Sequence, residues 1–317
     1  MNYNKASIHI PPVESPFFME WIAAKKNIPE NWKIWANELH DKGYTVLKNA
    51  IDTELIDKTV ASIKHLYPDN AGEEPARQLD LWSSNENVKK IALQQDILNF
   101  LAFIYERKPL PFQTLNFKFG TQQCLHSDLI HFSCIPKKYM CGIWVAFEDL
   151  DSDNGPLQYC EGSHKLPIYD YSDLNIPFSK RDYEYYPLYE DFIKELVKAN
   201  GLTVSELHIN KGDAMIWSAN LLHGGKEILG KGRTRWSQVT HVYFDDCVYY
   251  TPMWSDNYAG KLYVRHSMQN IATGEKIVNK IEGKEVGLLR GDDERYWVIG
   301  SGFRPSLLNM LKQSFLK

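Results

Sequence analysis

The sequence predicts a mainly β protein, a barrel or sandwich of short strands, with helices packed outside it. Two observations support this fold class. Between residues 112 and 244, short apolar or alternating runs are separated by turns rich in glycine and proline, which is typical of all-β folds. Between residues 32 and 110, apolar residues instead recur at helical spacing. The 317 residues are enough for one large domain, and we expect a single one.

The first third of the chain is expected to be mostly helical, after an irregular arm over residues 1–30 that prolines interrupt. Gly43 is placed to end a first helix, and Asp52 or Thr53 can cap a second. The expected elements are helices at 32–40, 53–66 and 86–105 and a strand at 44–47.

The β region should form the core over residues 112–244, with an insertion at 165–205 that carries a helix at 189–199. The continuous apolar run at 140–147 predicts a buried strand. Residues 245–317 form an extension with possible hairpins at Gly274 and Gly283 and a last helix from about 305 to 315. We expect the insertion and the extension to cover the mouth of the barrel. The other expected strands lie at 114–119, 124–129, 157–160, 206–209, 214–217 and 235–244.

Composition narrows the possible partners and location. The net charge is −4 and no basic block occurs, so nucleic acid is not a favoured partner. Five cysteines without CxxC spacing indicate reduced thiols and a cytoplasmic protein. No signal peptide is recognisable. No apolar run approaches the roughly 20 residues of a membrane span.

The stretch around His126 and Asp128 carries the first indication of chemistry. On a strand, residues two apart point to the same face, so this imidazole and this carboxylate can hold one metal ion. With a second histidine they would form the facial triad of non-heme Fe(II) oxygenases. The pair alone is weak evidence, because two residues of fixed type recur by chance.

His223, in a glycine-rich loop after the strand at 214–217, is the candidate for the second histidine. The alternative is an ordinary turn histidine. A 2-oxoacid bound to iron would also place its far carboxylate in the pocket, where a guanidinium pairs with it bidentately. Arg235 is the first candidate and Arg233, with the same strand parity, is the second. Either could instead be a surface charge on an edge strand.

In their order and spacing, these segments resemble the phytanoyl-CoA dioxygenase family of Fe(II)/2-oxoglutarate oxygenases. The resemblance runs from about Trp35 to Phe244. It implies a double-stranded β-helix, a jelly-roll or cupin-like barrel, with Fe(II), 2-oxoglutarate as cosubstrate and O₂. The matching segments are 43–48, 116–118, 126–128, 154–157 with 162–165, and 223–224 with Arg235.

The resemblance implies a role for each matching residue. His126, Asp128 and His223 would ligate Fe(II), and Arg235 would bind the C5 carboxylate of 2-oxoglutarate. Lys118 matches a position that contacts 2-oxoglutarate. Three further residues, Trp144, Gly225 and His164, also fall at family positions.

Trp144 falls where some members place a tryptophan beside the cosubstrate, although a plain core tryptophan is an equal alternative. The family often has Ser or Thr where this chain has Gly225, so one hydroxyl contact is missing. His164 is expected to stabilise a turn or face solvent. His131 should not share the metal face and could line the substrate pocket or simply pack.

The implied activity is hydroxylation of an unactivated carbon of a small-molecule substrate, with release of succinate and CO₂. Related halogenases carry a small residue in place of Asp128, so a carboxylate there favours hydroxylation, while desaturation and ring closure remain open. The alternatives are a non-catalytic, cupin-like metal-binding protein and a metal-dependent hydrolase that uses the same ligands. Tyrosines and tryptophans in 165–190 and 249–263 could line the substrate pocket.

Overall fold

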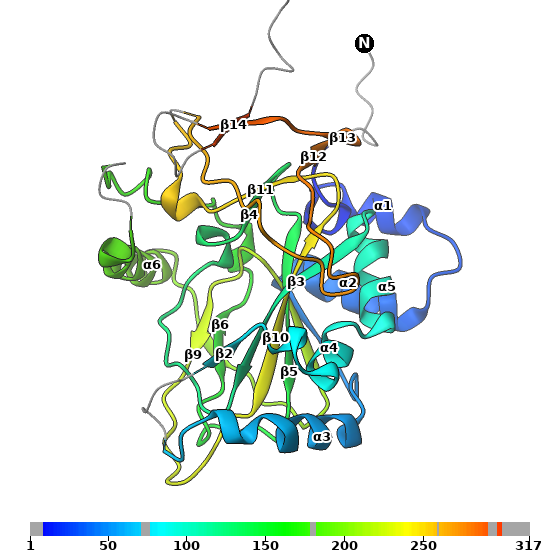
Figure 1. Cartoon of the computed structure of the whole chain (residues 1–317), viewed down its shortest axis with the longest axis vertical. Helices are drawn as coiled ribbons and strands as arrows, with labels where there is room; N and C mark the ends of the chain where they lie inside the picture. Colours follow the sequence, from blue (N-terminus) through cyan, green and yellow to red (C-terminus); the bar gives the residue numbers. More distant parts are fainter. Residues whose placement is uncertain (1–8, 71–76, 178–181, 259, 291–296, 300–317) are drawn as a thin grey trace, which may run out of the picture.

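A six-stranded antiparallel sheet is the centre of the molecule in this computed structural model, which describes residues 9–70, 77–177, 182–258, 260–290 and 297–299 (Figure 1). All of its strand pairs are antiparallel, in the order β1-β8-β5-β10-β3-β2. The predicted mainly β character is therefore confirmed. The strands are β1 (Tyr44–Leu47), β2 (Arg77–Leu79), β3 (Pro109–Phe117), β5 (Met140–Ala146), β8 (Ala214–Ser218) and β10 (Ser237–Phe244).

A second, three-stranded antiparallel sheet has the order β7-β6-β9. An isolated antiparallel bridge between His126 and His223 adds the chain around residue 126 beside β9. Three two-stranded ribbons complete the β structure among the described residues. The remaining strands are β4 (Ser133–Ile135), β6 (Leu157–Cys160), β7 (Val204–Glu206), β9 (His223–Gly225), β11 (Val248–Tyr250), β12 (Lys280–Ile281), β13 (Lys284–Glu285), β14 (Leu288–Arg290) and β15 (Trp297–Ile299).

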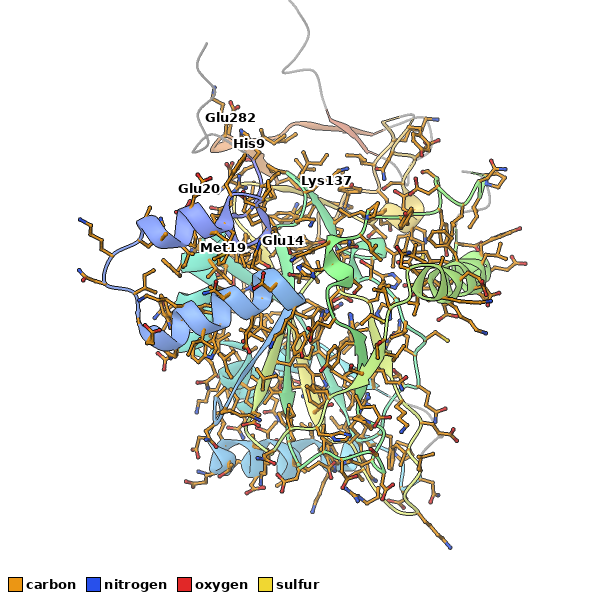
Figure 2. All side chains as sticks on the ribbon, turned by 180° about the vertical axis from the view of Figure 1, so that it is seen from behind. His9, Glu14, Met19, Glu20, Lys137 and Glu282 are labelled. Carbon is orange, nitrogen blue, oxygen red and sulfur yellow. The ribbon has the colours of Figure 1, made fainter. Side chains whose placement is uncertain are left out.

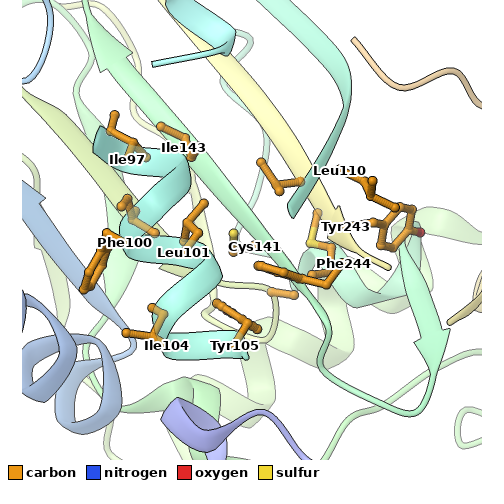
Figure 3. Close-up of a cluster of buried hydrophobic side chains, with 14 of the residues drawn as sticks. Ile97, Phe100, Leu101, Ile104, Tyr105, Leu110, Cys141, Ile143, Tyr243 and Phe244 are labelled. Carbon is orange, nitrogen blue, oxygen red and sulfur yellow. The ribbon is translucent and has the colours of Figure 1, made fainter. Parts of the chain in front are cut away.

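Helices cover one face of the six-stranded sheet. Helices α1, α2 and α5 lie together on that side, and α6 lies apart from them on the other side of the molecule (Figure 1). In Figure 3, α5 presents its apolar side chains to β5 and β10, where Tyr105 stacks on Phe244 at 3.8 Å between ring centroids. The helices are α1 (Phe18–Ala24), α2 (Glu30–Lys42), α3 (Thr53–Ile63), α4 (Glu86–Ala92), α5 (Gln95–Tyr105) and α6 (Tyr186–Ala199).

Strand β5 shows why the sequence contains one long apolar run. Ile143 and Val145 belong to the core shared with the helices, whereas Trp144 and Ala146 belong to a second core with Leu157 of β6. Successive side chains of a strand alternate between the two faces. Both faces of β5 are covered, so every position is buried and must be apolar or small.

The two predicted helix caps are confirmed. Gly43 ends α2 in the left-handed conformation, at φ 86°, which glycine adopts without a steric penalty. The Asp52 side chain accepts a hydrogen bond from the Glu54 backbone amide and so caps α3.

Residues 1–30 are not irregular throughout, contrary to prediction. Phe18 and Ile22, one helical turn apart, are buried in the main core, so α1 forms in spite of the nearby prolines. Figure 2 shows this arm from behind, with Met19 and Glu20 exposed on α1, whereas the Glu14 side chain is buried and pairs with Lys138.

Other predicted boundaries also differ from the structure. The helix expected at 86–105 is two helices, because Gln94 has extended backbone angles, φ −58° and ψ 112°, and starts α5 as its N-cap. Helix α6 starts at Tyr186, three residues before the predicted start at Tyr189. The strand expected at 206–209 is β7, which ends at Glu206.

The extension after residue 245 folds back onto the sheet. The Ile271 amide donates to the Pro111 carbonyl of β3, and the Lys280 amide donates to the Cys247 carbonyl. The hairpin predicted at Gly283 joins β12 to β13, whereas the helix predicted from 305 to 315 lies outside the described residues. No helix in the described part of the chain is both long and apolar enough to cross a membrane.

Candidate active site

A cavity of about 340 Å³ lies between the six-stranded and the three-stranded sheet. One wall comes from β3, β5 and β10, through Leu115, Trp144 and Val239, and another from β6 and β9, through Leu157 and His223. The volume is at the small end of the range for ligand pockets. A small molecule fits in a cavity of this size.

His126, Asp128 and His223 meet at one wall of this cavity. Asp128 Oδ1 lies 3.7 Å from His126 Nε2 and 3.8 Å from His223 Nε2. Metal–ligand bonds to imidazole nitrogen and carboxylate oxygen are about 2.1 Å long, so one ion can reach all three atoms. These residues are the group of metal-ligating side chains found among the described residues, and all three are buried.

The strand predicted for residues 124–129 is wrong. His126 is extended and exchanges backbone hydrogen bonds of 2.9 and 3.0 Å with His223, but Asp128 already starts a 3-10 helix over residues 128–130. The Ser127 hydroxyl accepts from the Leu129 amide and caps this helix. The two side chains still converge, through a turn instead of strand alternation.

Backbone carbonyls fix the tautomers of both histidines. His126 Nδ1 lies 3.0 Å from the Cys124 carbonyl, and His223 Nδ1 lies 3.0 Å from the Leu221 carbonyl. Because a carbonyl only accepts hydrogen bonds, each neutral ring carries its proton on Nδ1 and leaves the Nε2 lone pair free. Both Nε2 atoms face the cavity as ready metal ligands.

The Asp128 carboxylate is kept ionised by its neighbours. Burial by itself would raise the pKa of this carboxyl, but attraction to the rings of His223, His241 and His126 when they are protonated, with a hydrogen bond from His126, lowers it below its usual range. A carboxylate that stays deprotonated at neutral pH is available as a metal ligand.

Trp217 of β8 orients the same carboxylate. Its indole Nε1–H donates a 2.8 Å hydrogen bond to Asp128 Oδ2, which directs Oδ1 to the two histidines. A Cβ atom at Gly142 would lie 2.2 Å from the Trp217 ring, so a glycine on β5 is needed to admit the indole. The sequence pattern identified the strand that carries Trp217 but not this contact.

His241 of β10 is a second side chain that the sequence analysis missed. It is buried in the cavity wall, with Nε2 3.9 Å from Asp128 Oδ2 and Nδ1 2.9 Å from Gln113 Oε1. Burial lowers the pKa of its imidazole to about 4. The available signal was its strand parity, because His241 lies two residues from Val239, on the same face.

Arg235 lines the cavity with a buried guanidinium that has no acidic partner among the described residues. The side chain is 2% exposed, Nη1 donates to the Gly155 carbonyl, and Nε makes no hydrogen bond with described residues. Burial lowers the pKa of this guanidinium to about 10, so it is charged at neutral pH. A buried, unpaired charge is costly, and an anionic ligand in the cavity would relieve this cost.

Two glycines leave the space in front of that guanidinium open. A Cβ at Gly120 would lie 2.9 Å from Arg235 Cζ, and a Cβ at Gly225 would lie 3.2 Å from Nη1. The family that the sequence resembles often has Ser or Thr at position 225. In this chain, Gly225 leaves room for the Arg235 guanidinium.

The structure does not bring Lys118 into this cavity. Leu115 and Phe117 of β3 line it, and Lys118 extends away, with Nζ donating to the Pro68 carbonyl at 2.6 Å. Strand alternation separates them. The predicted contact of Lys118 with 2-oxoglutarate is therefore not supported by this geometry. Trp144 lines the cavity and also belongs to the second core, so its contact with the cosubstrate stays a prediction.

Of the three remaining candidate residues, only one lines the cavity. Arg233 is on the surface and forms a 3.0 Å ion pair with Asp151, so it is no competitor for Arg235. His164 is buried instead of facing solvent; its Nε2 lies 2.9 Å from the His40 carbonyl. His131 lines the cavity with Nε2 3.3 Å from the Tyr186 hydroxyl.

The family of the chain follows from a sequence comparison. The family model named phytanoyl-CoA dioxygenase matches residues 39–235, which is more than half of the chain. The chain therefore belongs to the phytanoyl-CoA dioxygenase family. Among curated proteins, none matches this chain significantly.

Solved structures show a similar fold. The epimerase SnoN from nogalamycin biosynthesis, in complex with Fe3+, alpha ketoglutarate and nogalamycin RO, has a TM-score of 0.54 and 16% identity, over 85% of this chain and 98% of that one. EctD from S. alaskensis with 2-oxoglutarate and 5-hydroxyectoine has a TM-score of 0.54 and 15% identity, over 74% and 81%. The carbocyclase SnoK from nogalamycin biosynthesis has a TM-score of 0.51 and 13% identity, over 70% and 87%. At these identities the likeness concerns the fold alone.

Proposed function

We propose that this protein is a non-heme Fe(II)/2-oxoglutarate-dependent dioxygenase that hydroxylates a carbon of a small-molecule substrate. The observation that carries the proposal is the pairing of two features in one cavity. These features are the cluster of His126, Asp128 and His223 and the buried, unpaired guanidinium of Arg235. A site that only stores a metal has no need of the arginine.

Each residue has a defined task in this proposal. His126, Asp128 and His223 hold Fe(II), and Arg235 pairs with the far carboxylate of 2-oxoglutarate. Bound iron supplies O₂ activation coupled to oxidative decarboxylation, in which one oxygen atom enters succinate and the other the substrate hydroxyl. Trp144 walls the cosubstrate from solvent, and Trp217 keeps Asp128 in its ligating orientation.

The sheet arrangement is compatible with a double-stranded β-helix. We propose that the six-stranded and three-stranded sheets are the two halves of a jelly-roll barrel. They face one another across the cavity that carries the candidate ligands. The chain would then be a single oxygenase domain, with residues 245–317 as an extension of the barrel.

Succinate release under air tests the proposal. Purified protein with Fe(II) and 2-oxoglutarate should form succinate slowly without substrate, and Asp128→Ala should not. An Arg233→Ala variant, altered at an exposed ion pair away from the cavity, is the matched control and should match wild type. Absence of succinate from a protein that binds both Fe(II) and 2-oxoglutarate would contradict the oxygenase function.

Two measurements address the alternatives. A hydrolase would be active with Zn(II), whereas the oxygenase should be inactive with Zn(II) and regain activity with Fe(II). With the true substrate, hydroxylation adds one oxygen atom to the product mass, and this atom derives from O₂. An epimerisation leaves the mass unchanged, and ring closure lowers it by two hydrogens.

A further inference from the structure

The chain that follows the family match contributes its own wall to the cavity. The match ends at residue 235, but Thr251, Trp254 and Arg265 also line the cavity. The Arg265 backbone amide donates to the Tyr249 carbonyl of β11, which holds Arg265 beside the ribbon of β11 and β4. In Figure 1 it runs beside β4 and β11 at the upper end of the sheet.

The Arg265 guanidinium is oriented by neutral groups. Its Cζ lies 4.8 Å from the centre of the Phe132 ring, Nη1 donates to the Thr251 hydroxyl at 3.2 Å, and Nε donates to Met268 Sδ at 3.3 Å. No carboxylate of the described residues forms an ion pair with it. The stacked ring and the two hydrogen bonds fix the direction of the guanidinium, and Nη2 remains available to a ligand.

Arg265 is close to the candidate metal site. Its aromatic support, Phe132, contacts the His241 ring at 4.8 Å between centroids, and His241 lies 3.9 Å from Asp128. Two aromatic rings, Phe132 and His241, therefore link Arg265 to the metal ligands.

No described side chain that lines the cavity is a counterion for Arg265; the Asp80 carboxylate, which does not line the cavity, interacts with it electrostatically without forming an ion pair. Among the described lining residues, the charged side chains are Asp128, Arg235, Arg265 and Arg77. If the proposed function holds, Fe(II) and the 2-oxoglutarate dianion cancel, and Asp128 and Arg235 cancel. Arg265, and Arg77 at the exposed rim, then make the loaded cavity cationic, which favours an anionic substrate.

Aromatic side chains at the rim of the cavity add apolar surface to the positive charge of its arginines. Tyr183 and Trp254 meet edge to face at 5.9 Å, and Tyr186 stacks against His131 at 5.3 Å. Such rings bind apolar chains and rings through their faces. The substrate site thus combines a guanidinium with an apolar lining.

We propose that Arg265 binds a carboxylate of the substrate, so that the enzyme oxidises a small organic acid with an apolar or ring-bearing body. This inference rests on the proposed function and deepens it. The carboxylate would lie at Arg265, and a carbon further along the molecule would face the metal ligands. Specificity would then come from residues that follow the family match.

The test uses full-length protein loaded with Ni(II) and saturating 2-oxoglutarate, which fills the Arg235 site without turnover. The probes are aryl- and alkyl-substituted carboxylic acids, such as 4-phenylbutanoate, each paired with its primary amide. Calorimetric titration should show at least one acid that binds about tenfold or more tightly than its amide, because a charge-assisted pair is lost in the amide.

Arg265→Gln should remove this preference, Arg265→Lys should keep part of it, and Arg233→Gln should leave it unchanged. The Arg265 variants should bind 2-oxoglutarate as wild type does, and their melting curves report folding. The inference is overturned if acids and amides bind alike, if none of the acids binds, or if the preference survives in Arg265→Gln. Tighter binding of matched phosphate monoesters than of the acids would also overturn it. If wild type does not bind 2-oxoglutarate, the proposed function itself fails, which distinguishes the two failures.

Discussion

Replacing Arg235 with alanine should weaken 2-oxoglutarate binding strongly and leave metal binding intact. The guanidinium is buried, makes one hydrogen bond, to the Gly155 carbonyl, and has no acidic partner among the described residues. It is not in the group formed by His126, Asp128 and His223. Its removal therefore changes the cosubstrate end of the cavity and not the metal end.

The expected loss of 2-oxoglutarate affinity can be estimated from the guanidinium partner that the ligand carboxylate loses. A buried carboxylate without its charge-assisted partner is destabilised by about 3 kcal/mol. At about 1.4 kcal/mol per tenfold change in dissociation constant, this is roughly a hundredfold. Arg235→Lys should recover part of the loss, because an ammonium restores the charge but not the bidentate geometry.

The assay is an anaerobic titration of 2-oxoglutarate into Fe(II)-loaded protein, with iron content measured on the same samples. Arg233→Ala is the control, since Arg233 pairs with Asp151 on the surface. Normal 2-oxoglutarate affinity in Arg235→Ala, together with a loss in Arg233→Ala, would refute the assignment of the anchor. Loss of iron from Arg235→Ala would show that the two ends of the cavity are not independent.

Four further outcomes are expected. Asp128→Ala should lose iron and succinate formation yet melt cooperatively, as iron analysis and calorimetry would show. Trp217→Phe keeps the ring but not the hydrogen bond to Asp128, so iron affinity should fall roughly tenfold or more, and unchanged affinity would contradict the orienting role. Burial holds the pKa of His241 at about 4, below its unfolded value, so the unfolded state binds the extra proton. Between about pH 6.5 and about pH 4 this residue should contribute a fall of about 1.4 kcal/mol per pH unit to the unfolding free energy, so the free energy of unfolding should fall less steeply with pH in His241→Gln. His164→Ala should lower the melting temperature, because the buried ring packs beside Gly43, without changing iron content or turnover.

Short apolar and alternating runs predicted the sheet well. The run at 140–147 became β5, buried on both faces, and the runs at 157–160 and 214–217 became β6 and β8. These predictions depend on local sequence alone, because a run of apolar or alternating residues bounded by turn residues indicates a strand whatever lies elsewhere in the chain. The helix caps at Gly43 and Asp52 were predicted correctly for the same reason.

Contacts between segments that lie far apart in the chain could not be predicted from the sequence. Nothing local to Trp217 indicates that its indole reaches Asp128, or that Gly142 of a neighbouring strand leaves room for it. Lys118 shows the opposite failure. Its position in the sequence matched a family position that contacts 2-oxoglutarate, but strand alternation turns the side chain away from the cavity.

The convergence of His126 and Asp128 shows why a wrong local prediction can still identify a site. Their spacing was explained by strand alternation, but Asp128 starts a 3-10 helix that Ser127 caps. What brings the carboxylate to His223 is the backbone bridge between His126 and His223, assisted by the Trp217 hydrogen bond. The residue types are therefore constrained by the ligation chemistry, while the backbone between them is free to be a strand or a turn. A pattern of ligand types is thus a better guide to this site than the secondary structure expected around it.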